Sequence, residues 1–507
     1  MGDEVAPAAG PACRATGLCA VTYVLILLLL LPPAGWWLVA HAGWSERTRR
    51  TLVFLTALWF GLWPLLAWRE LGRPLLAVLA VAVALLVLAG LGMVRLLRRV
   101  FRRRLSRPVL TGRIVGGFVV GLLVVALVCG GTLARGGRDR EQIKKGMAEP
   151  RTFGPAHLDI VEGLPVLHLY GTPEEMGRQY GTILRPSLEA LFRYFDRLMP
   201  RALYRRLRER AIEREKRLPD HYRRELKAVA EASGLPYEVL VTANLTPRMR
   251  CTVLLAWGEA TADGATIFAR NSEYFSMGLK DCGSLIIVWH PKEGMAQASL
   301  NFLGMIGTFN GVNEAGLCCG NLVVYNARHN DLNEEALPVQ FVLREAGDRL
   351  RTADDLRDHL LNRPTIMPVQ VAMADANRAH IVELGLHSKA ARTPERDYLA
   401  AGNFFHGAER CRGRAPAWFH RRYDRLIEFA ESNYGRIDPR NITQALYQAR
   451  APHPFNIHSM VFEPARMKIH VSYNRYPASA GPFVEMDLKT LFAAPPATPG
   501  DDRLTAP

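Results

Sequence analysis

The chain contains the stretch Cys251-Thr-Val-Leu-Leu-Ala-Trp257, followed after an Asp263-Gly264 turn by Thr266-Ile-Phe-Ala-Arg-Asn-Ser-Glu273. Short apolar runs separated by an Asp-Gly pair are typical of two β-strands joined by a turn. The first run begins with a cysteine, and the second delivers Arg270 and Glu273. The sequence therefore predicts a pair of strands that brings a thiol close to a cation and a carboxylate.

Cysteine attacks acyl groups as the thiolate, so Cys251 needs a base or a lowered pKa. Cleavage of the peptide bond between Arg250 and Cys251 would give Cys251 a free α-amine, whose pKa is about 8 before perturbation. That amine can serve as the base for the thiol of the same residue. Two alternatives stay open at this point. One is a buried core cysteine, the commoner role of a cysteine at a strand start. The other is a Cys–His pair, for which the sequence singles out no histidine.

The length of 507 residues allows two or three domains, and the net charge of +16 is unevenly spread. Residues 1–150 carry 19 Lys+Arg against 7 Asp+Glu, in clusters that lie between apolar runs. This distribution is typical of membrane topology and not of nucleic-acid binding. Four apolar runs are long enough to cross a bilayer. A transmembrane region is therefore predicted over 1–135, with spans near 17–41, 51–68, 74–94 and 113–134.

The basic loops between these runs predict an orientation. Residues 95–107 hold seven arginines, and Ser45-Glu-Arg-Thr-Arg-Arg50 is also basic. Because basic loops stay in the cytoplasm, the N-terminus and the domain after the fourth span are expected outside it. The prediction is a multi-pass integral membrane protein with an extracytoplasmic catalytic domain and the bilayer as a partner.

After residue 135 the pattern changes to that of a folded domain. Thr172 is a plausible N-cap with Pro173 at the first helical position, and residues 186–233 predict two or three amphipathic helices. Strands are predicted over 251–257, 265–270, 283–290, 298–312, 317–325, 369–375, 380–384, 397–401, 458–463 and 467–473. Helices are predicted over 334–348, 353–361, 415–432 and 440–448. This order indicates sheets covered by helices. The predicted regions are a helical propeptide over 136–250, a catalytic domain over 251–490 and a disordered Pro-rich tail over 491–507.

Neither a metal nor a cofactor is expected. The eight cysteines form no CxxC pair, the histidines show no metal spacing, and adjacent Cys318 and Cys319 are typical of a buried strand. The chain also lacks a Gly-x-Ser-x-Gly elbow, a His-Glu-x-x-His motif and a phosphate-binding glycine loop. The sequence therefore leaves Cys251 as the principal candidate nucleophile.

Several separate blocks carry a resemblance to a known family. They are Gly171–Gly181 (GTPEEMGRQYG), Ala230–Leu240 with Asn244, Cys251-Thr252, Phe268–Glu273, Gly307–Leu317 with Gly320-Asn321-Leu322, and Ala374–Glu383. Through them, residues from about 160 to 490 resemble the acyl-CoA:6-aminopenicillanic acid acyltransferase family of N-terminal-nucleophile hydrolases. They are more distantly similar to choloylglycine hydrolases and to acid ceramidases. The resemblance implies an α+β fold, a four-layer αββα sandwich that begins at Cys251.

The resemblance also implies a role for each matching residue. Cys251 would be the nucleophile and its α-amine the general base. Arg270 and Glu273 would orient that amine and the substrate. Asn321 and Asn403 would stabilise the oxyanion of the transition state, a function that contributes several kcal/mol in acyl transfer.

Five positions depart from the family pattern. Glu273 stands where Asp is usual, and Arg250 precedes the nucleophile, where a small or acidic residue would be less surprising. Gly402 and Phe404 flank Asn403 in place of Thr and His, and Gln370 replaces the Asn of many relatives. These departures could reshape specificity, slow self-cleavage or mark a catalytically degenerate member.

The expected function is that of a membrane-anchored, self-processing amidohydrolase or acyltransferase acting on a linear amide through an acyl-thioester on Cys251. The expected substrate is an N-acyl lipid or N-acyl amino compound, and the two fragments left by cleavage are expected to stay together. Arg422 is expected to bind substrate as an active-site cation, with an arginine on a helix surface as the alternative. The alternative function is a degenerate protein of the same fold that binds a ligand or partner.

Overall fold

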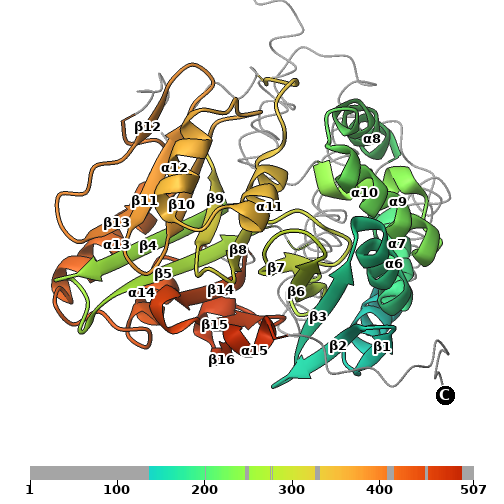
Figure 1. Ribbon diagram of the computed structural model, residues 1–507, viewed down its shortest axis with the longest axis horizontal. Helices are drawn as coiled ribbons and strands as arrows, with labels where there is room; N and C mark the ends of the chain where they lie inside the picture. Colours follow the sequence, from blue (N-terminus) through green and yellow to red (C-terminus); the bar gives the residue numbers. More distant parts are fainter. Residues whose placement is uncertain are drawn as a thin grey trace, which may run out of the picture. The chain divides into compact units, whose positions relative to one another are not determined.

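The computed structural model describes residues 136–199, 201–245, 250–274, 276, 278–325, 332–407, 416–451 and 455–493 (Figure 1). The chain divides into two compact units, Met1–Gly130 and Gly131–Pro507, and all the described residues belong to the second. This unit is a mixed α/β fold of two sheets and their covering helices.

The prediction of a transmembrane region needs correction. Among the helices that the structure describes, none has both the length and the apolar character required to cross a membrane. This finding contradicts the predicted four-helix transmembrane region, and with it the multi-pass membrane localisation and the extracytoplasmic catalytic domain. The segments 17–41, 51–68, 74–94 and 113–134 themselves lie outside the described residues.

The larger sheet has ten strands. Its order is β1 (Arg151–Phe153), β2 (Ala156–Val161), β3 (Leu164–Gly171), β6 (Ser284–Pro291), β7 (Gln297–Phe302), β8 (Asn310–Asn313), β9 (Cys318–Val323), β10 (Val369–Ala374), β11 (Ala379–Leu384) and β12 (Lys389–Ala391). Neighbouring strands pair antiparallel except β3 and β6, which are parallel. A parallel pair requires a crossover connection. Here the described part of that connection contains five helices, α6 to α10, and two strands of the smaller sheet, β4 and β5.

The smaller sheet has six antiparallel strands. Its order is β13 (Tyr398–Ala401), β4 (Arg250–Gly258), β5 (Gly264–Glu273), β14 (Asn456–Glu463), β15 (Lys468–Tyr473) and β16 (Val484–Asp487). The predicted pair of strands on either side of Asp263-Gly264 is therefore present as β4 and β5. In Figure 1 these yellow-green strands lie between the orange β13 and the red β14, which come from much later in the chain.

The two sheets pack face to face. Because successive side chains of a strand point to opposite faces, Val253 and Leu255 of β4 share one hydrophobic core with Ile286 and Val288 of β6. Leu254, the intervening residue of β4, packs on the opposite face with α13 and α14. Cys251 continues the inward-facing series and belongs to the core between the sheets.

Helices cover both outer faces. Those on the larger sheet are α6 (Pro173–Ile183), α7 (Arg185–Leu198), α9 (Asp220–Ser233), α10 (Tyr237–Leu245), α11 (Val339–Arg349) and α12 (Ala353–Leu361), with α8 (Arg201–Glu215) against α10. Those on the smaller sheet are α13 (Ala417–Ser432) and α14 (Ile442–Gln448). The remaining short helices are α15 (Leu488–Leu491), η1 (Pro464–Arg466) and η2 (Ala478–Ala480). The predicted helix start at Thr172 is confirmed, because its side chain caps α6 in a capping box with Glu175.

Candidate active site

Cys251 lies at the second position of β4 and is completely buried. The register pairs Cys251 with Ser272 and Arg250 with Glu273. The beginning of β4 therefore meets the end of β5, where the sequence placed its candidate cation and carboxylate. The sequence predicted that these residues gather around Cys251, and this register brings them to the same end of the strand pair.

Arg270 contacts the sulfur directly. Its Nη2 donates to Cys251 Sγ at 3.0 Å and to the backbone carbonyl of Asn321 at 2.6 Å, while its Nε donates to Ser272 Oγ at 3.2 Å. Arg270 has no exposed surface. The fully buried guanidinium is thus held by three contacts with one of its N–H groups aimed at the thiol.

Gly320 makes room for this guanidinium. A Cβ added to Gly320 would lie 1.9 Å from Arg270 Nη1, closer than any two heavy atoms can approach without a bond. In the sequence, Gly320 stands out only as part of a block that carries the family resemblance. Its role depends on packing across the two sheets, which no local pattern reveals.

Two opposing effects act on the Cys251 thiol. Burial raises its pKa above the ordinary value, and the positive charge of Arg270 opposes that rise. Glu273 adds a smaller contribution in the same direction as burial. Since burial is the largest cause, the thiol of the uncut chain is protonated at neutral pH, and Arg270 alone does not make it a thiolate.

Glu273 pairs with Arg422 and not with Arg270. Arg422 Nη2 donates to Glu273 Oε2, and the backbone N–H of Ala451 donates to the other carboxylate oxygen. Arg422 Nε donates to the carbonyl of Ala449 at 2.8 Å. Both side chains of the pair are buried, Arg422 at 4% and Glu273 at 0% exposure. The alternative of a helix-surface arginine at 422 is therefore wrong.

Burial dominates the ionisation of this pair as well. It raises the pKa of Glu273, against the effect of the Arg422 charge and of the Ala451 N–H. Arg422 stays protonated, because a guanidinium holds its proton in proteins. The pair places a buried cation and its carboxylate partner near Cys251, on whose thiol both charges act.

Asn403 contacts the backbone nitrogen of Cys251. Its Oδ1 accepts from the Cys251 N–H at 3.1 Å, and its Nδ2 donates to the carbonyl of Val323 at 2.7 Å. The resemblance implied an oxyanion donor at this position. In the structure one N–H of the amide nitrogen donates to Val323, and the acceptor oxygen faces the atom that self-cleavage would turn into an amine.

Gln370 holds Asn403 in place. Its Nε2 donates to the carbonyls of Gly402 and Phe404, both at 2.8 Å. Three of the departures from the family pattern, Gln370, Gly402 and Phe404, thus belong to one contact set around Asn403. A side chain one methylene longer than Asn can bridge both carbonyls.

Asn321 lies on β9 and is 4% exposed. Its backbone carbonyl accepts from the same Nη2 of Arg270 that reaches Cys251. Its side-chain Oδ1 has no hydrogen-bond partner among the residues that the structure describes. Asn321 is therefore adjacent to the thiol, with an amide oxygen that no described donor satisfies.

Arg250, the residue before Cys251, lies among three aromatic rings. Its Cζ is 5.2 Å from the ring centroids of Tyr325 and Phe455 and 5.9 Å from that of Trp418. A cation within about 6 Å of an aromatic face is attracted to it. The preceding residues 246–249 lie outside the described part of the chain.

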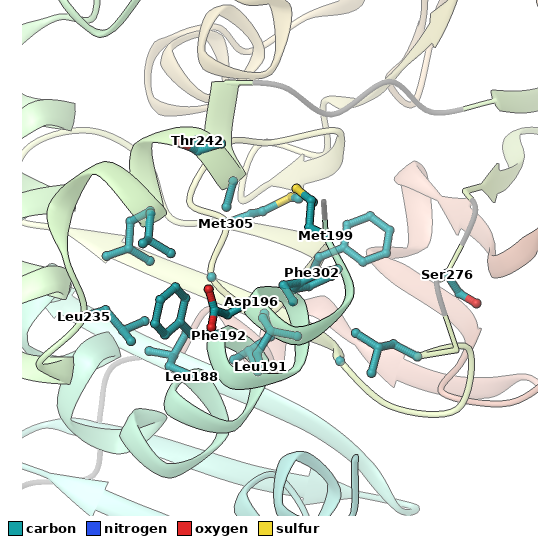
Figure 2. Close-up of a pocket in the computed structure, with 18 of the residues that line it drawn as sticks. Leu188, Leu191, Phe192, Asp196, Met199, Leu235, Thr242, Ser276, Phe302 and Met305 are labelled. Carbon is teal, nitrogen blue, oxygen red and sulfur yellow. The ribbon is translucent and has the colours of Figure 1, made fainter. Parts of the chain in front are cut away.

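An apolar cavity of about 210 Å³ lies beside the end of β5. Tyr274, which follows Glu273, lines it, as does Ile457, which follows the β14 partner of Glu273. Figure 2 shows Leu191 and Phe192 of α7 around the same hollow as Phe302 and Met305. Four of the polar lining residues are Asp196, Thr242, Ser276 and Ser284. No sequence pattern predicts this cavity, because its walls come from segments more than 100 residues apart.

Comparisons with known proteins give limited similarities. No family model matches the chain. Protein dcd1B of Dictyostelium discoideum is 23% identical over 254 residues, which are 44% of this chain and 50% of that protein. Protein dcd1A of the same organism is 23% identical over 269 residues, which are 45% of this chain and 56% of that protein. The chain spans about half the length of these curated relatives.

Solved structures of amide-cleaving enzymes are also similar. An N-acylethanolamine-hydrolyzing acid amidase ortholog of Caenorhabditis elegans has a TM-score of 0.35 and 16% identity, over 42% of this chain and 93% of that one. The penicillin V acylase of Agrobacterium tumefaciens has a TM-score of 0.33 and 14% identity, over 47% of this chain and 86% of that one. At these TM-scores and identities, the similarities assign no activity to this chain.

Proposed function

We propose that this chain is a proenzyme that cleaves its own Arg250–Cys251 bond and then acts as a cysteine amidohydrolase or acyltransferase. The observation that carries the proposal is the convergence of two side chains on Cys251. Arg270 Nη2 lies 3.0 Å from the sulfur, and Asn403 Oδ1 lies 3.1 Å from the backbone nitrogen. A nucleophile that supplies its own base needs both atoms of that residue held.

Self-cleavage would use the thiol on the preceding carbonyl. Cys251 Sγ forms a bond to the carbonyl carbon of Arg250, the bond from that carbon to the Cys251 nitrogen breaks, and the thiol proton goes to that nitrogen. Water then hydrolyses the thioester, which leaves a carboxylate on Arg250 and restores the thiol. Asn403 Oδ1, already an acceptor for this nitrogen, stays its partner as the nitrogen becomes an amine.

Turnover of a substrate would repeat the same bond changes. The α-amine of Cys251 takes the thiol proton, and Arg270 stabilises the thiolate. The thiolate attacks the amide carbonyl of the substrate, and Asn321 is the proposed donor to the resulting oxyanion. The proton passes from the α-ammonium to the leaving amine as the carbon–nitrogen bond breaks. Water resolves the acyl-thioester in hydrolysis, and a second amine resolves it in transfer.

In the uncut chain the buried position of the thiol disfavours the thiolate, and this scheme supplies the base that the thiolate needs. Burial raises the pKa of Cys251, so the thiolate needs a proton acceptor nearby. An α-amine with a pKa of about 8 is such an acceptor at neutral pH. The scheme therefore requires no histidine partner.

The cavity beside β5 supports an apolar acyl group on the substrate. Its lining is mostly Leu, Phe, Met and Ile side chains, and its volume of about 210 Å³ suits a short hydrocarbon chain. Each buried methylene contributes about 0.8 kcal/mol to binding. We therefore propose an N-acyl compound with an apolar acyl group as the substrate.

The sheet topology supports lasting association of the two fragments. β3 precedes the cleavage site and β6 follows it, and they pair along six residues from Val166–Ile286 to Gly171–Pro291. The helices α6, α9 and α10 share a core with Leu285, Ile287 and Trp289 of β6. We propose that residues 136–250 remain bound to residues 251–493 after cleavage.

One observation favours a second candidate function. Cys251 has no exposed surface in the uncut chain, so a protein that never cleaves itself would not expose its thiol to a substrate. Such a protein would be a ligand-binding member of the same fold that uses the apolar cavity.

Gel electrophoresis and N-terminal sequencing of the purified chain separate the two functions. We expect a fragment that begins at Cys251, and we expect Cys251→Ala to remain whole. Cys282→Ala is the matched control, because Cys282 is also a buried cysteine but belongs to the core between the larger sheet and its helices. The Cys282→Ala protein should be cleaved like the wild type. A folded wild-type chain that stays intact would exclude self-processing and leave the ligand-binding function.

A further inference from the structure

Three titratable side chains gather on one face of the larger sheet. His157 and Asp159 are two residues apart on β2 and therefore share a face. His168 on β3 is the direct partner of His157 in the antiparallel pair. One ligand atom of each of these three residues lies within 4.8 Å of the others. The group lies on β2 and β3 of the larger sheet, whereas Cys251 belongs to the smaller sheet.

The distances suit a small transition-metal ion. His157 Nε2 lies 3.5 Å from Asp159 Oδ2. In a tetrahedral zinc site with bonds of about 2.0–2.1 Å, ligand atoms lie about 3.3 Å apart. The imidazoles of His157 and His168 are stacked, with ring centroids 4.4 Å apart and an interplanar angle of 13°. Side-chain rotations would bring the three donors, which already lie within 4.8 Å of one another, onto one ion.

Both imidazoles have a partner on the nitrogen away from the ion. His157 Nδ1 donates to the carbonyl of Pro155 at 3.3 Å, which leaves Nε2 as the nitrogen that can bind a cation. His168 Nδ1 lies 3.3 Å from His290 Nε2 on β6. In the tautomer that places the hydrogen on His168 Nδ1, His168 Nε2 is also free to bind a cation. Such partners on the second nitrogen fix the orientation of histidine ligands in metal sites.

Burial and exposure are divided as a binding site requires. His168 is 5% exposed, so the surrounding protein shields its ring from solvent. The His157 side chain is 19% and that of Asp159 51% exposed, so an ion can reach the group from solvent.

We propose that His157, Asp159 and His168 bind one Zn²⁺ ion, with a fourth coordination position open to solvent. Two imidazoles and one carboxylate are nitrogen and oxygen ligands that zinc prefers, whereas Ca²⁺ and Mg²⁺ prefer oxygen alone. The sequence predicted no metal, because the ligands have no motif spacing. The hairpin between β2 and β3 brings His168 opposite His157.

Zinc titration of the full chain tests the proposal. The protein is stripped with a chelator, dialysed under reducing conditions and titrated with ZnCl₂ by calorimetry. We expect the wild type to bind one ion per chain. We expect this binding to be lost, or to be at least tenfold weaker, in His157→Ala and in Asp159→Asn. Asp159→Asn keeps the shape of a half-exposed side chain, so it remains informative if His157→Ala folds poorly. His387→Ala, an exposed histidine on another part of the surface, should bind like the wild type.

Cobalt binding provides a second measurement, which does not rely on calorimetry. Co²⁺ in a tetrahedral site of nitrogen and oxygen ligands absorbs visible light, and we expect this absorption in the wild type and its loss in both variants. Absence of zinc binding in the wild type would overturn the proposal. Equal zinc affinity in wild type and both variants would overturn it too, since the ion would then lie elsewhere. Cleavage after Arg250 is measured separately, so failure of that function leaves this test intact.

Discussion

Arg270 and Cys251 are 19 residues apart in the sequence, yet Arg270 Nη2 donates a hydrogen bond to the Cys251 sulfur at 3.0 Å. The pairing of β4 with β5 brings them together, because Val253 is the direct partner of Arg270 and Cys251 lies on the same face two residues before it. Burial raises the pKa of the thiol, and this guanidinium is the largest effect that lowers it. The thiol is thus placed where neighbouring charges shift its pKa.

Replacing Arg270 with Gln should slow self-cleavage. The variant removes the charge that opposes burial, so the pKa of Cys251 rises further and less thiolate forms at neutral pH. We expect a rate at least about tenfold lower, since one pKa unit corresponds to about 1.4 kcal/mol, and a rate that recovers at higher pH. Translation in vitro followed by a timed chase measures the rate. Arg270→Lys keeps the charge and should lie between the two, whereas equal rates in all three would contradict a role for the charge.

Gly320→Ala should displace the same guanidinium without altering its charge. The added Cβ would lie 1.9 Å from Arg270 Nη1, so the side chain must leave its contact with the sulfur. Overpacking of this kind costs about 1–3 kcal/mol, and slower cleavage should accompany it. Gly137→Ala is the control, because its Cβ meets nothing within 4 Å. Chemical unfolding and the chase experiment together check this prediction, and unchanged cleavage in Gly320→Ala would refute it.

Glu273 and Arg422 should stabilise the fold only as a pair. Each is buried against the other, and removing one partner of a buried ion pair costs about 3–5 kcal/mol. We expect Glu273→Gln and Arg422→Met each to destabilise the protein strongly, and the double variant to lose less than the sum. Urea unfolding of the four proteins gives the coupling free energy. Arg185→Met, which breaks the exposed pair with Glu189, should cost about 0.3–0.5 kcal/mol; a similar small cost at Arg422 would show that the buried pair does not matter for stability.

His458 should make stability fall in acid. It is fully buried, bonded through Nε2 to Ser284 Oγ at 2.8 Å, and its pKa is lowered from 6.5 to about 3 by burial. The unfolded chain therefore takes up a proton at a higher pH than the folded chain. The stability that this histidine provides is complete above about pH 6.5 and is lost as the pH falls toward about 3, by at most about 1.4 kcal/mol per pH unit. His458→Gln, which does not titrate, should show a smaller change in urea midpoint between neutral and mildly acid pH. Identical slopes would rule out His458 as the cause.

Met305→Trp should narrow the substrate range without affecting self-cleavage. Met305 lines the apolar cavity (Figure 2), and the larger side chain would occupy space that an acyl chain needs. On a series of N-acyl 4-nitroanilides, the wild type should gain rate with acyl length, by up to about fourfold per buried methylene at 0.8 kcal/mol. The variant should lose that gain for the longer chains. If the preference for long chains survives, the acyl group binds elsewhere.

The local elements followed closely from the sequence. The predicted strand 251–257 corresponds to β4 (Arg250–Gly258), and the predicted helix 353–361 to α12 (Ala353–Leu361). The strand predicted over 298–312 is two strands, β7 (Gln297–Phe302) and β8 (Asn310–Asn313). Alternation of apolar residues continues through the connecting turn, so periodicity alone does not show the break. The short edge strands β1, β12 and β16 carry too few apolar residues to be predicted.

The candidate site was only partly open to prediction. The strand pair placed Arg270 and Glu273 near Cys251, but the partner of Glu273 is Arg422, 149 residues later. One signal for Arg422 was present in the sequence, because Arg422 lies three residues after Phe419 and four before Leu426, which is helical spacing. All three residues belong to the buried face of α13. The expected donation by Asn403 to an oxyanion stays a prediction, and the structure adds that its oxygen accepts from the Cys251 nitrogen. Which end of an amide faces a neighbour depends on contacts such as Val323, and these arise only when the sheets assemble.

By itself, the sequence determined most of the strands and helices of residues 136–493 and singled out Cys251, since hydrophobic periodicity and turn residues act over short distances along the chain. The tertiary structure decided how Cys251 is surrounded: a guanidinium on its sulfur, an amide oxygen on its nitrogen and an ion pair close by. It also contradicted the predicted transmembrane region and brought His157, Asp159 and His168 together. The physical reason is that burial and charge act through space, where residues far apart in sequence become neighbours, and a one-dimensional pattern does not contain those distances.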